Sequence, residues 1–307
     1  MKWLLVPGLV LFFLSFALNA QDVNKNPNKK EPPILGPHWE RFNANIHAAK
    51  GNPDMSYHGG PILPSVTVKA IFWGSSWPSY TGDKITGLDK WYKYVGTTKN
   101  GGGSKYFATV NEYNDAAGQQ VGTAITYQGH VVDGTSAPKH PSTSAVLAEV
   151  CKEISTPTAK AYYPVYIDQP RGSANYCAYH SWGTCHGKAI EFGFFFKLDG
   201  DAGCDPQSTV SGQSQGLKAV ANVTGHELSE TRSDPNGNAW YDSSGEENGD
   251  KCAWSFGGPF VTFLDGTHWK VQGNWSNYDY DHGSGYENSS SEAGCADGTN
   301  APGPYTN

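Results

Sequence analysis

The sequence has no excess of basic residues and, after its first 20 residues, no long apolar run. It contains 22 Lys and Arg against 29 Asp and Glu, and the basic residues form no patch. Because nucleic acids are bound largely through clustered Lys and Arg on their phosphates, this composition argues against a nucleic-acid partner. A membrane-spanning helix needs about 20 mainly apolar residues, so we expect no membrane span in the mature protein.

The apolar residues that do cluster lie at the start of the chain. Met1 and Lys2 form a short positive head, an apolar run extends from Trp3 to Leu18, and Ala20 is a small residue suited to cleavage. This order is typical of a secretory signal peptide. We therefore expect residues 1–20 to be removed and the protein to be secreted.

An even number of cysteines supports export. In an oxidising compartment such a set indicates disulfides, although six cysteines allow about 15 pairings and the sequence does not select one. The motif from Cys177 to His180, with Cys185 and His186 nearby, also has the residue types of a zinc cluster, but secretion favours disulfides there. The six cysteines are Cys151, Cys177, Cys185, Cys204, Cys252 and Cys295.

Three Asn-x-Ser/Thr sequons begin at Asn222, Asn274 and Asn288. In a secreted protein of a glycosylating host, Asn274 and Asn288 are the candidates for modification. Asn222 lies four residues before His226, on the same helix face as that histidine. A glycan on Asn222 would cover the site predicted below, so either this sequon is unused or that site is wrong.

The pattern of turns and apolar stretches predicts one layered domain at residues 56–283. Residues 21–55, rich in Asn, Lys and Pro, are expected to be a linker or a removable pro-segment, and residues 284–307 a Ser/Gly/Asn-rich tail. Strands mixed with helices indicate an α/β (α+β) fold, with a mixed twisted sheet and a zincin-like site helix packed on it. We expect strands near 66–73, 120–127, 161–167 and 189–197, and helices near 84–94, 144–154 and 212–231.

The helix expected over residues 212–231 carries the motif His226-Glu227-Leu228-Ser229-Glu230. Its apolar residues recur at spacings of three and four and form one stripe. At about 100° per residue, His226 and Glu230 fall on the opposite face, so we expect them to line a cleft. The stripe consists of Leu217, Val220, Ala221, Thr224 and Leu228.

Residues four apart on a helix project side by side, which lets two side chains share one metal ion. In the common zinc peptidase motif both ligands are His and the Glu after the first is the general base. Here the second ligand would be Glu230, since a carboxylate is an acceptable zinc ligand, and Glu227 would be the base. The carboxylate also makes Ca²⁺ an alternative to Zn²⁺. A surface helix with ordinary solvated acids is the competing interpretation.

A third ligand is expected from the segment 234–250, which has five acidic residues and no Lys or Arg. We favour Glu247, because its separation from Glu230 lets the chain turn back onto the helix. Asp234 and Asp250 are alternative ligands, or groups that orient a ligand.

Two further sequence patterns allow other interpretations of the function. Residues 212–216 match the nucleophile elbow of serine hydrolases, but the segment before them is polar and turn-like, not the core strand that this motif needs. Several aromatic residues near the end of the domain could stack on sugars, although such residues are more often plain strand and loop aromatics. They are Trp269, Trp275, Tyr278 and Tyr280.

Several stretches, taken in order, resemble the phosphate-induced (EXORDIUM-like) protein family. They cover about residues 57–277 and include 57–63 (YHGGPIL), 71–74 (IFWG), 163–167 (YPVYI), Cys177, 185–187 (CHG) and Cys204. The resemblance implies secretion to the cell wall or apoplast. The chain is most similar to the microbial branch, through 226–230, 234–235 (DP), 240–242 (WYD), 247–252 (ENGDKC), Gln272 and 275–277 (WSN).

These observations lead to three hypotheses. The first is a secreted zincin-like metal-dependent hydrolase that acts on extracellular peptides or proteins, with Zn²⁺ held by His226, Glu230 and Glu247. The second is a non-catalytic extracellular or cell-wall protein with a structural ion such as Ca²⁺ that binds polysaccharide or another protein. The third is a secreted growth regulator without a metal. We expect a monomer in each case.

Overall fold

The computed structural model describes residues 34–36, 53–96 and 105–299. The expected signal peptide, most of the expected linker or pro-segment and residues 300–307 lie outside the described residues. None of the described helices is long and apolar enough to cross a membrane.

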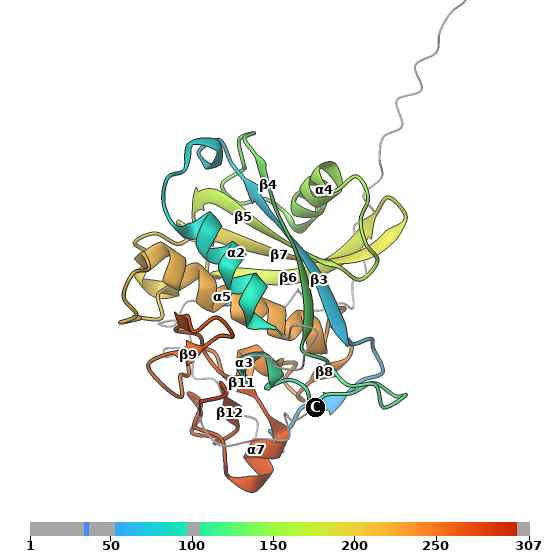
Figure 1. Ribbon diagram of the computed structural model, residues 1–307. Helices are drawn as coiled ribbons and strands as arrows, with labels where there is room; N and C mark the ends of the chain where they lie inside the picture. Colours follow the sequence, from blue (N-terminus) through green and yellow to red (C-terminus); the bar gives the residue numbers. More distant parts are fainter. Residues whose placement is uncertain (1–33, 37–52, 97–104, 300–307) are drawn as a thin grey trace, which may run out of the picture.

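A six-stranded mixed sheet forms the centre of the domain (Figure 1). The strands lie in the order β1-β6-β7-β5-β3-β4. The four strands from β7 to β4 are parallel, whereas β6 runs antiparallel to β7 and β1 antiparallel to β6. This confirms the predicted α/β (α+β) class. The strands are β1 (Ile34–Leu35), β3 (Ser65–Trp73), β4 (Ala124–Asp133), β5 (Tyr162–Pro170), β6 (Ala178–Cys185) and β7 (Lys188–Lys197).

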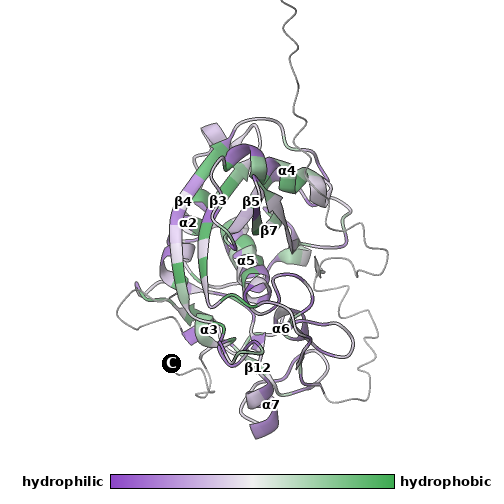
Figure 2. Ribbon diagram, turned by 90° about the vertical axis from the view of Figure 1, so that its right-hand side faces the viewer, coloured by the Kyte–Doolittle hydropathy of each residue, from purple (hydrophilic) through white to green (hydrophobic). Residues whose placement is uncertain are grey.

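Both faces of this sheet are covered, which explains the near-continuous apolar run of its inner strands. In β7 every residue from Ile190 to Phe196 is buried. Helices α2 (Lys84–Val95) and α5 (Gln215–Ser233) cover one face, and α4 (Thr143–Glu153) covers the other (Figures 1 and 2). The predicted strands and helices therefore exist, although β4 begins four residues later than the stretch 120–127. Strand β6 was not predicted.

Helix α5 begins where its sequence provides a cap. The hydroxyl of Ser214 accepts from the backbone N–H of Leu217, which satisfies one free donor of the first turn. Pro235 lies just beyond Ser233, so the helix ends where a proline prevents its continuation. The role of Ser214 as an N-cap also accounts for the motif at residues 212–216, and its hydroxyl contacts Asp83.

The C-terminal third of the chain packs below α5 in short elements (Figure 1). Residues 284–299 are part of this packing: Cys295 and Ala296 are buried, and β12 pairs with β11. Residues 284–299, which the composition assigns to a Ser/Gly/Asn-rich tail, therefore pack onto the domain. The short elements are β8 (Trp240–Tyr241), α6 (Asn248–Lys251), β9 (Val261–Thr262), β10 (His268–Trp269), β11 (Asn274–Trp275), α7 (Asn277–His282) and β12 (Cys295–Ala296). Two elements from earlier in the chain pack with them: β2 (Ser56–Tyr57), which pairs with β8, and α3 (Lys105–Ala108).

All six cysteines form disulfides, as predicted for an exported chain. The pairs are Cys151–Cys185, Cys177–Cys204 and Cys252–Cys295. Cys177 and Cys185 therefore bond to different partners and are not part of a zinc cluster. His180, which lies between them in the sequence, belongs to the candidate metal site described below.

Candidate metal site

The motif on α5 brings three potential ligands to one face, as its spacing predicts. Nε2 of His226 lies 3.0 Å from Oε1 of Glu230, one helical turn later. Donor atoms of His226, Glu227 and Glu230 all lie within 4.8 Å of one another. These side chains point toward the sheet and the segments that follow the helix.

Strand β6 adds a histidine that the sequence did not assign to the site. Side chains alternate along a strand, so His180 faces α5, whereas Gly183 faces Leu147 of α4 on the other side of the sheet. Nε2 of His180 lies 3.6 Å from Oε2 of Glu230 and 3.2 Å from Oε2 of Glu247. His180, Glu230 and Glu247 form a second group of donors within 4.8 Å, and Glu230 belongs to both groups.

The acidic segment returns to the helix at Glu247, as predicted. Glu247 precedes α6, whose backbone crosses the site at close range. A Cβ atom on Gly249 would lie 2.8 Å from Nδ1 of His226 and 2.9 Å from Oε1 of Glu230, so glycine is needed there. Asp250 is placed at the margin: its N–H donates to Oε1 of Glu230 at 2.9 Å, and its carboxylate lies 3.8 Å from Nε2 of His226.

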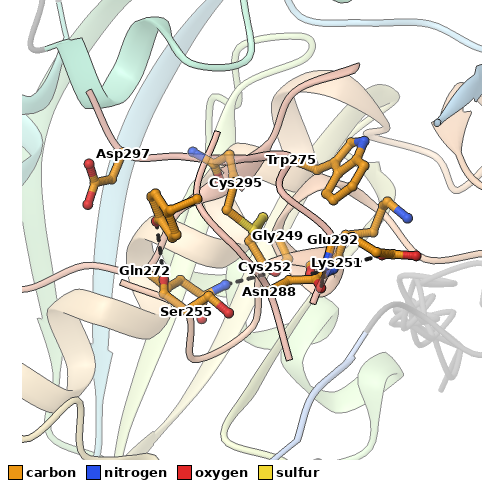
Figure 3. The surroundings of a disulfide bond; sticks show 12 residues. Gly249, Lys251, Cys252, Ser255, Gln272, Trp275, Asn288, Glu292, Cys295 and Asp297 are labelled. Atoms are coloured by element: carbon orange, nitrogen blue, oxygen red, sulfur yellow. Dashed lines mark hydrogen bonds between the residues drawn. A yellow bond between two sulfur atoms is a disulfide. The ribbon is translucent and has the colours of Figure 1, made fainter. Parts of the chain in front are cut away.

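Gln272 holds the imidazole of His226 from the far side. Nε2 of Gln272 lies 2.8 Å from Nδ1 of His226 and donates to the carbonyl of Gly249 at 2.8 Å. The Cys252–Cys295 disulfide and Ser255 flank Gln272 and Gly249 in this region (Figure 3). Gln272 is among the residues that carry the family resemblance, but no pattern in the sequence linked it to His226.

Within the described residues, His226 and Glu230 do not line an open cleft as predicted, since both side chains are fully buried. His180, His226, Glu227 and Glu230 are all 0% exposed, and Glu247 is 1% exposed. The helix face opposite the apolar stripe is covered by segments that follow it in the sequence, including Gly249 and Gln272. Sequence periodicity shows which residues share a face, but not whether a later segment covers that face.

Burial raises the pKa of the Glu247 carboxyl group and lowers the pKa of the His180 imidazole, so it favours the neutral form of both groups. Burial, with the nearby carboxylates of Asp234 and Glu230, raises the pKa of Glu247 well above its usual value. Burial and the neighbouring His226 lower the pKa of His180 to about 3, so its imidazole is neutral at pH 7. Neutral imidazole is the form that binds a metal.

The basic side chains close to this cluster are engaged elsewhere. The ammonium group of Lys251 lies 2.9 Å from Asp242. The guanidinium group of Arg232 donates to the carbonyls of Phe107 and Gly122 and lies over the Phe107 ring. The buried carboxylates of the site are therefore not neutralised by these two cations.

Neighbouring donors of the site have the chemistry and the spacing of zinc ligands. Four ligands at about 2.0 Å in a tetrahedron lie about 3.3 Å apart. The observed separations of 3.0, 3.2 and 3.6 Å between nitrogen and oxygen donors bracket that value. Among the described residues, Nε2 of His226 and Oε1 of Glu247 are buried without a hydrogen-bond partner. Such atoms are rare in native structures and call for a partner.

A third cluster of acidic residues, formed by Asp133, Glu149 and Glu153, differs from the candidate site because a lysine already neutralises it. The ammonium group of Lys152 lies among these acids, 2.5 Å from Asp133 and 3.2 Å from Glu149. A lysine thus occupies the place that a cation would take.

The alternative ligand Asp234 is buried but has a different role. Its Oδ1 accepts from the N–H groups of Asn238 and Ala239, which holds the turn after α5. Burial raises its pKa to about 7. Asp234 belongs to neither group of donors around Glu230.

The structure resolves the conflict over Asn222 and removes one glycosylation candidate. Asn222 and Asn274 are both 0% exposed. Oδ1 of Asn222 accepts from the backbone of Gln272, and Nδ2 of Asn274 donates to Thr109. Neither can carry a glycan in the folded protein, so the prediction for Asn274 is wrong and Asn222 does not argue against the site. Asn288 is half-buried, and its glycosylation stays a prediction.

The aromatic residues considered for sugar stacking are mostly inside the protein. Trp269 is 2% and Trp275 0% exposed, so neither ring presents a face to a polysaccharide. Tyr280 is half-buried, and Tyr278 is 37% exposed.

No family model, curated protein or solved structure matches the chain. The proposals that follow therefore rest on its own residues.

Proposed function

We propose that the chain is a secreted metal-dependent hydrolase of the zincin-like kind that acts on peptide bonds. The observation that carries this proposal is the convergence on Glu230 of two imidazoles and a second carboxylate, all buried, beside Glu227. His226, Glu230 and Glu247 are the ligands suggested by the sequence, and His180 is the one added by its position.

A bound Zn²⁺ lowers the pKa of a water ligand from its value in bulk toward 7. Glu227 lies on the same helix face as the donors and is placed to accept a proton from that water and to pass it to the leaving amine. The amide of Gln272 keeps the His226 ring in its orientation, and the backbone of Asp250 does the same for the Glu230 carboxylate.

The second candidate is a structural ion in a non-catalytic extracellular protein. Two observations favour it: the cluster is fully buried, and four protein donors are available, from His180, His226, Glu230 and Glu247. Structural zinc sites have four protein ligands, whereas catalytic sites keep one position open for water. The two candidates share the metal and differ in whether a substrate reaches it.

Glu227→Gln separates them. We expect the zinc-loaded variant to keep its ion and its melting temperature but to lose cleavage of a peptide library by about 10²–10⁴-fold. Glu153→Gln, a half-exposed acid on α4, is the matched control and should cleave like the wild type. A zinc-loaded wild type that cleaves no peptide, or a Glu227→Gln variant as active as the wild type, contradicts the hydrolase proposal.

A further inference from the structure

The edge of the sheet nearest to the candidate site is occupied by a very short strand. Strand β1 pairs with β6 at two positions, Ile34 with Tyr179 and Leu35 with Ala178. The carbonyl of Leu35 also accepts from the N–H of Cys177 at 2.7 Å. In the described part of the chain, this is the strand pairing on the outer edge of β6, the strand that carries His180.

Leu35 lies on the side of the sheet that faces the site. Residues paired across an antiparallel ladder project to the same face, so Leu35 shares a face with Ala178. Ala178 in turn shares a face with His180, two residues later. Leu35 is 0% exposed and belongs to the main hydrophobic core. The edge thus has a buried position for an aliphatic side chain beside the site.

A chain of hydrogen bonds connects this segment to His226. The indole N–H of Trp254 donates to the carbonyl of Gly36 at 2.9 Å, and the backbone N–H of Trp254 donates to Oε1 of Gln272. Gln272 contacts His226. Trp254 has a φ of 60°, a conformation that costs energy for a bulky residue and is typical of functional sites. The backbone of residues 34–36 is therefore bound as a peptide ligand would be, through carbonyls and one apolar side chain.

We propose that the outer edge of β6 is a peptide-binding edge, held in this structure by the chain's own Ile34–Gly36. An extended peptide with an aliphatic residue in place of Leu35 takes the same position by adding a strand to the sheet. This inference rests on the proposed function, because it makes such a peptide the substrate class. The segment 34–36 lies within the stretch expected to be a linker or pro-segment, so it is a built-in competitor of the substrate.

The test uses the full chain with Leu35→Asp, which places a charge in the apolar position and should release β1. The probe is a labelled synthetic peptide with the sequence of residues 31–37, compared with the same peptide carrying Asp in place of Leu35. We expect the variant to bind the first peptide at least about tenfold more tightly than the wild type does, because its edge is free, and to bind the second weakly. Val132→Asp, at an exposed position on the opposite edge strand β4, is the matched control.

Because Leu35 is fully buried, Leu35→Asp could unfold the protein, so the test includes a second variant that changes the core less. Trp254→Phe keeps an aromatic ring but removes the donor to Gly36. We expect the amide hydrogen of Cys177 to exchange about tenfold faster in both variants, while the amides of β5 keep their protection. Unchanged exchange at Cys177 in Trp254→Phe, or faster exchange without any binding of the probe, overturns the proposal.

Metal content, measured on the same samples, keeps this inference separate from the proposed function. Protein that binds the probe but holds no ion contradicts the hydrolase and supports the peptide-binding edge. Protein that holds the ion but does not bind the probe overturns only the proposal of a peptide-binding edge.

Discussion

Nε2 of His180 lies 3.2 Å from Oε2 of Glu247, although the two residues are 67 positions apart in the sequence. One comes from the antiparallel strand β6 and the other from the segment that precedes α6. Between them lies Glu230 of α5, whose two oxygens face His226 and His180 respectively. The sheet, the long helix and the returning acidic segment thus meet at one carboxylate.

His180 is the site residue that the structure adds, and its substitution tests that addition. We expect His180→Ala to weaken zinc binding by at least about 100-fold, because a ligand is lost and the remaining carboxylates repel each other. His186→Ala is the matched control, since His186 is exposed and hydrogen-bonds to the carbonyl of Cys151. Isothermal titration of the metal-free proteins gives both affinities. Equal affinities in His180→Ala and the wild type would exclude His180 as a ligand.

Gln272→Leu tests the group behind His226. Outer hydrogen bonds to a ligating histidine fix its orientation, and their loss typically weakens metal binding about 10–100-fold. We expect Gln272→Leu to weaken zinc binding about 10–100-fold, measured by the same isothermal titration. Gln213→Leu serves as the control, because that side chain donates to the carbonyl of His268 in a different part of the surface. A loss below about twofold would mean that Gln272 does not orient the imidazole.

The raised pKa of Glu191 predicts that the protein becomes less stable as the pH rises. Burial raises its pKa from the ordinary 4.5 to about 8, in a pocket of about 230 Å³ that Trp182 and Lys160 also line. Between these two pH values the folded state binds the proton more tightly than the unfolded state. The stabilisation from protonated Glu191 is therefore complete below pH 4.5 and is lost as the pH rises to about 8. Over this range the free energy of unfolding falls with a slope of up to about 1.4 kcal/mol per pH unit.

We expect Glu191→Gln to flatten this dependence, so that the variant is more stable than the wild type at pH 8 and similar at pH 4.5. Urea unfolding at a series of pH values measures it. Glu287→Gln, at an exposed position, should keep the wild-type slope. A Glu191→Gln variant with the same slope as the wild type would show that Glu191 titrates normally.

The Cys252–Cys295 disulfide holds the segment after α6 against the C-terminal strand pair (Figure 3). It closes a loop with a sequence separation of 43, so replacing both cysteines by serine should lower the free energy of unfolding by about 3–4 kcal/mol. We also expect weaker zinc binding, because Gly249 and Gln272 lose their support. Replacing Cys151 and Cys185, which join α4 to the far end of β6, should lower stability but leave zinc affinity within about twofold. Equal effects of both double variants on zinc affinity would contradict this local role.

The sequence predicts much of the fold because local patterns determine it. Continuous apolar runs identify β3, β5 and β7, and the 3.6-residue period together with Ser214 and Pro235 identifies α5. Strand β6 was missed because its residues mix polar and apolar types, and His180 appears among cysteines that indicate disulfides. Which face His180 takes depends on its pairing with β7, and this pairing is not visible in the residues of β6 alone.

The candidate site was predicted in part for the same reason. The spacing of His226 and Glu230 on a helix is a local property, and the acidic composition of residues 234–250 points to Glu247. Burial of the pair and its contact with Gln272 depend on later segments, and Gln272 itself is 46 residues after His226. The resemblance to the EXORDIUM-like family and secretion to the cell wall stay predictions.

The central claim is that His226, His180, Glu230 and Glu247 hold one ion. The most direct test is the metal content of the purified mature protein, measured by inductively coupled plasma mass spectrometry after dialysis against buffer with micromolar zinc. We predict about one zinc ion per chain in the wild type and in Glu227→Gln, and less than about one tenth of that in His226→Ala and His180→Ala. A wild-type protein that folds, keeps its three disulfides and binds neither zinc nor calcium would contradict the account.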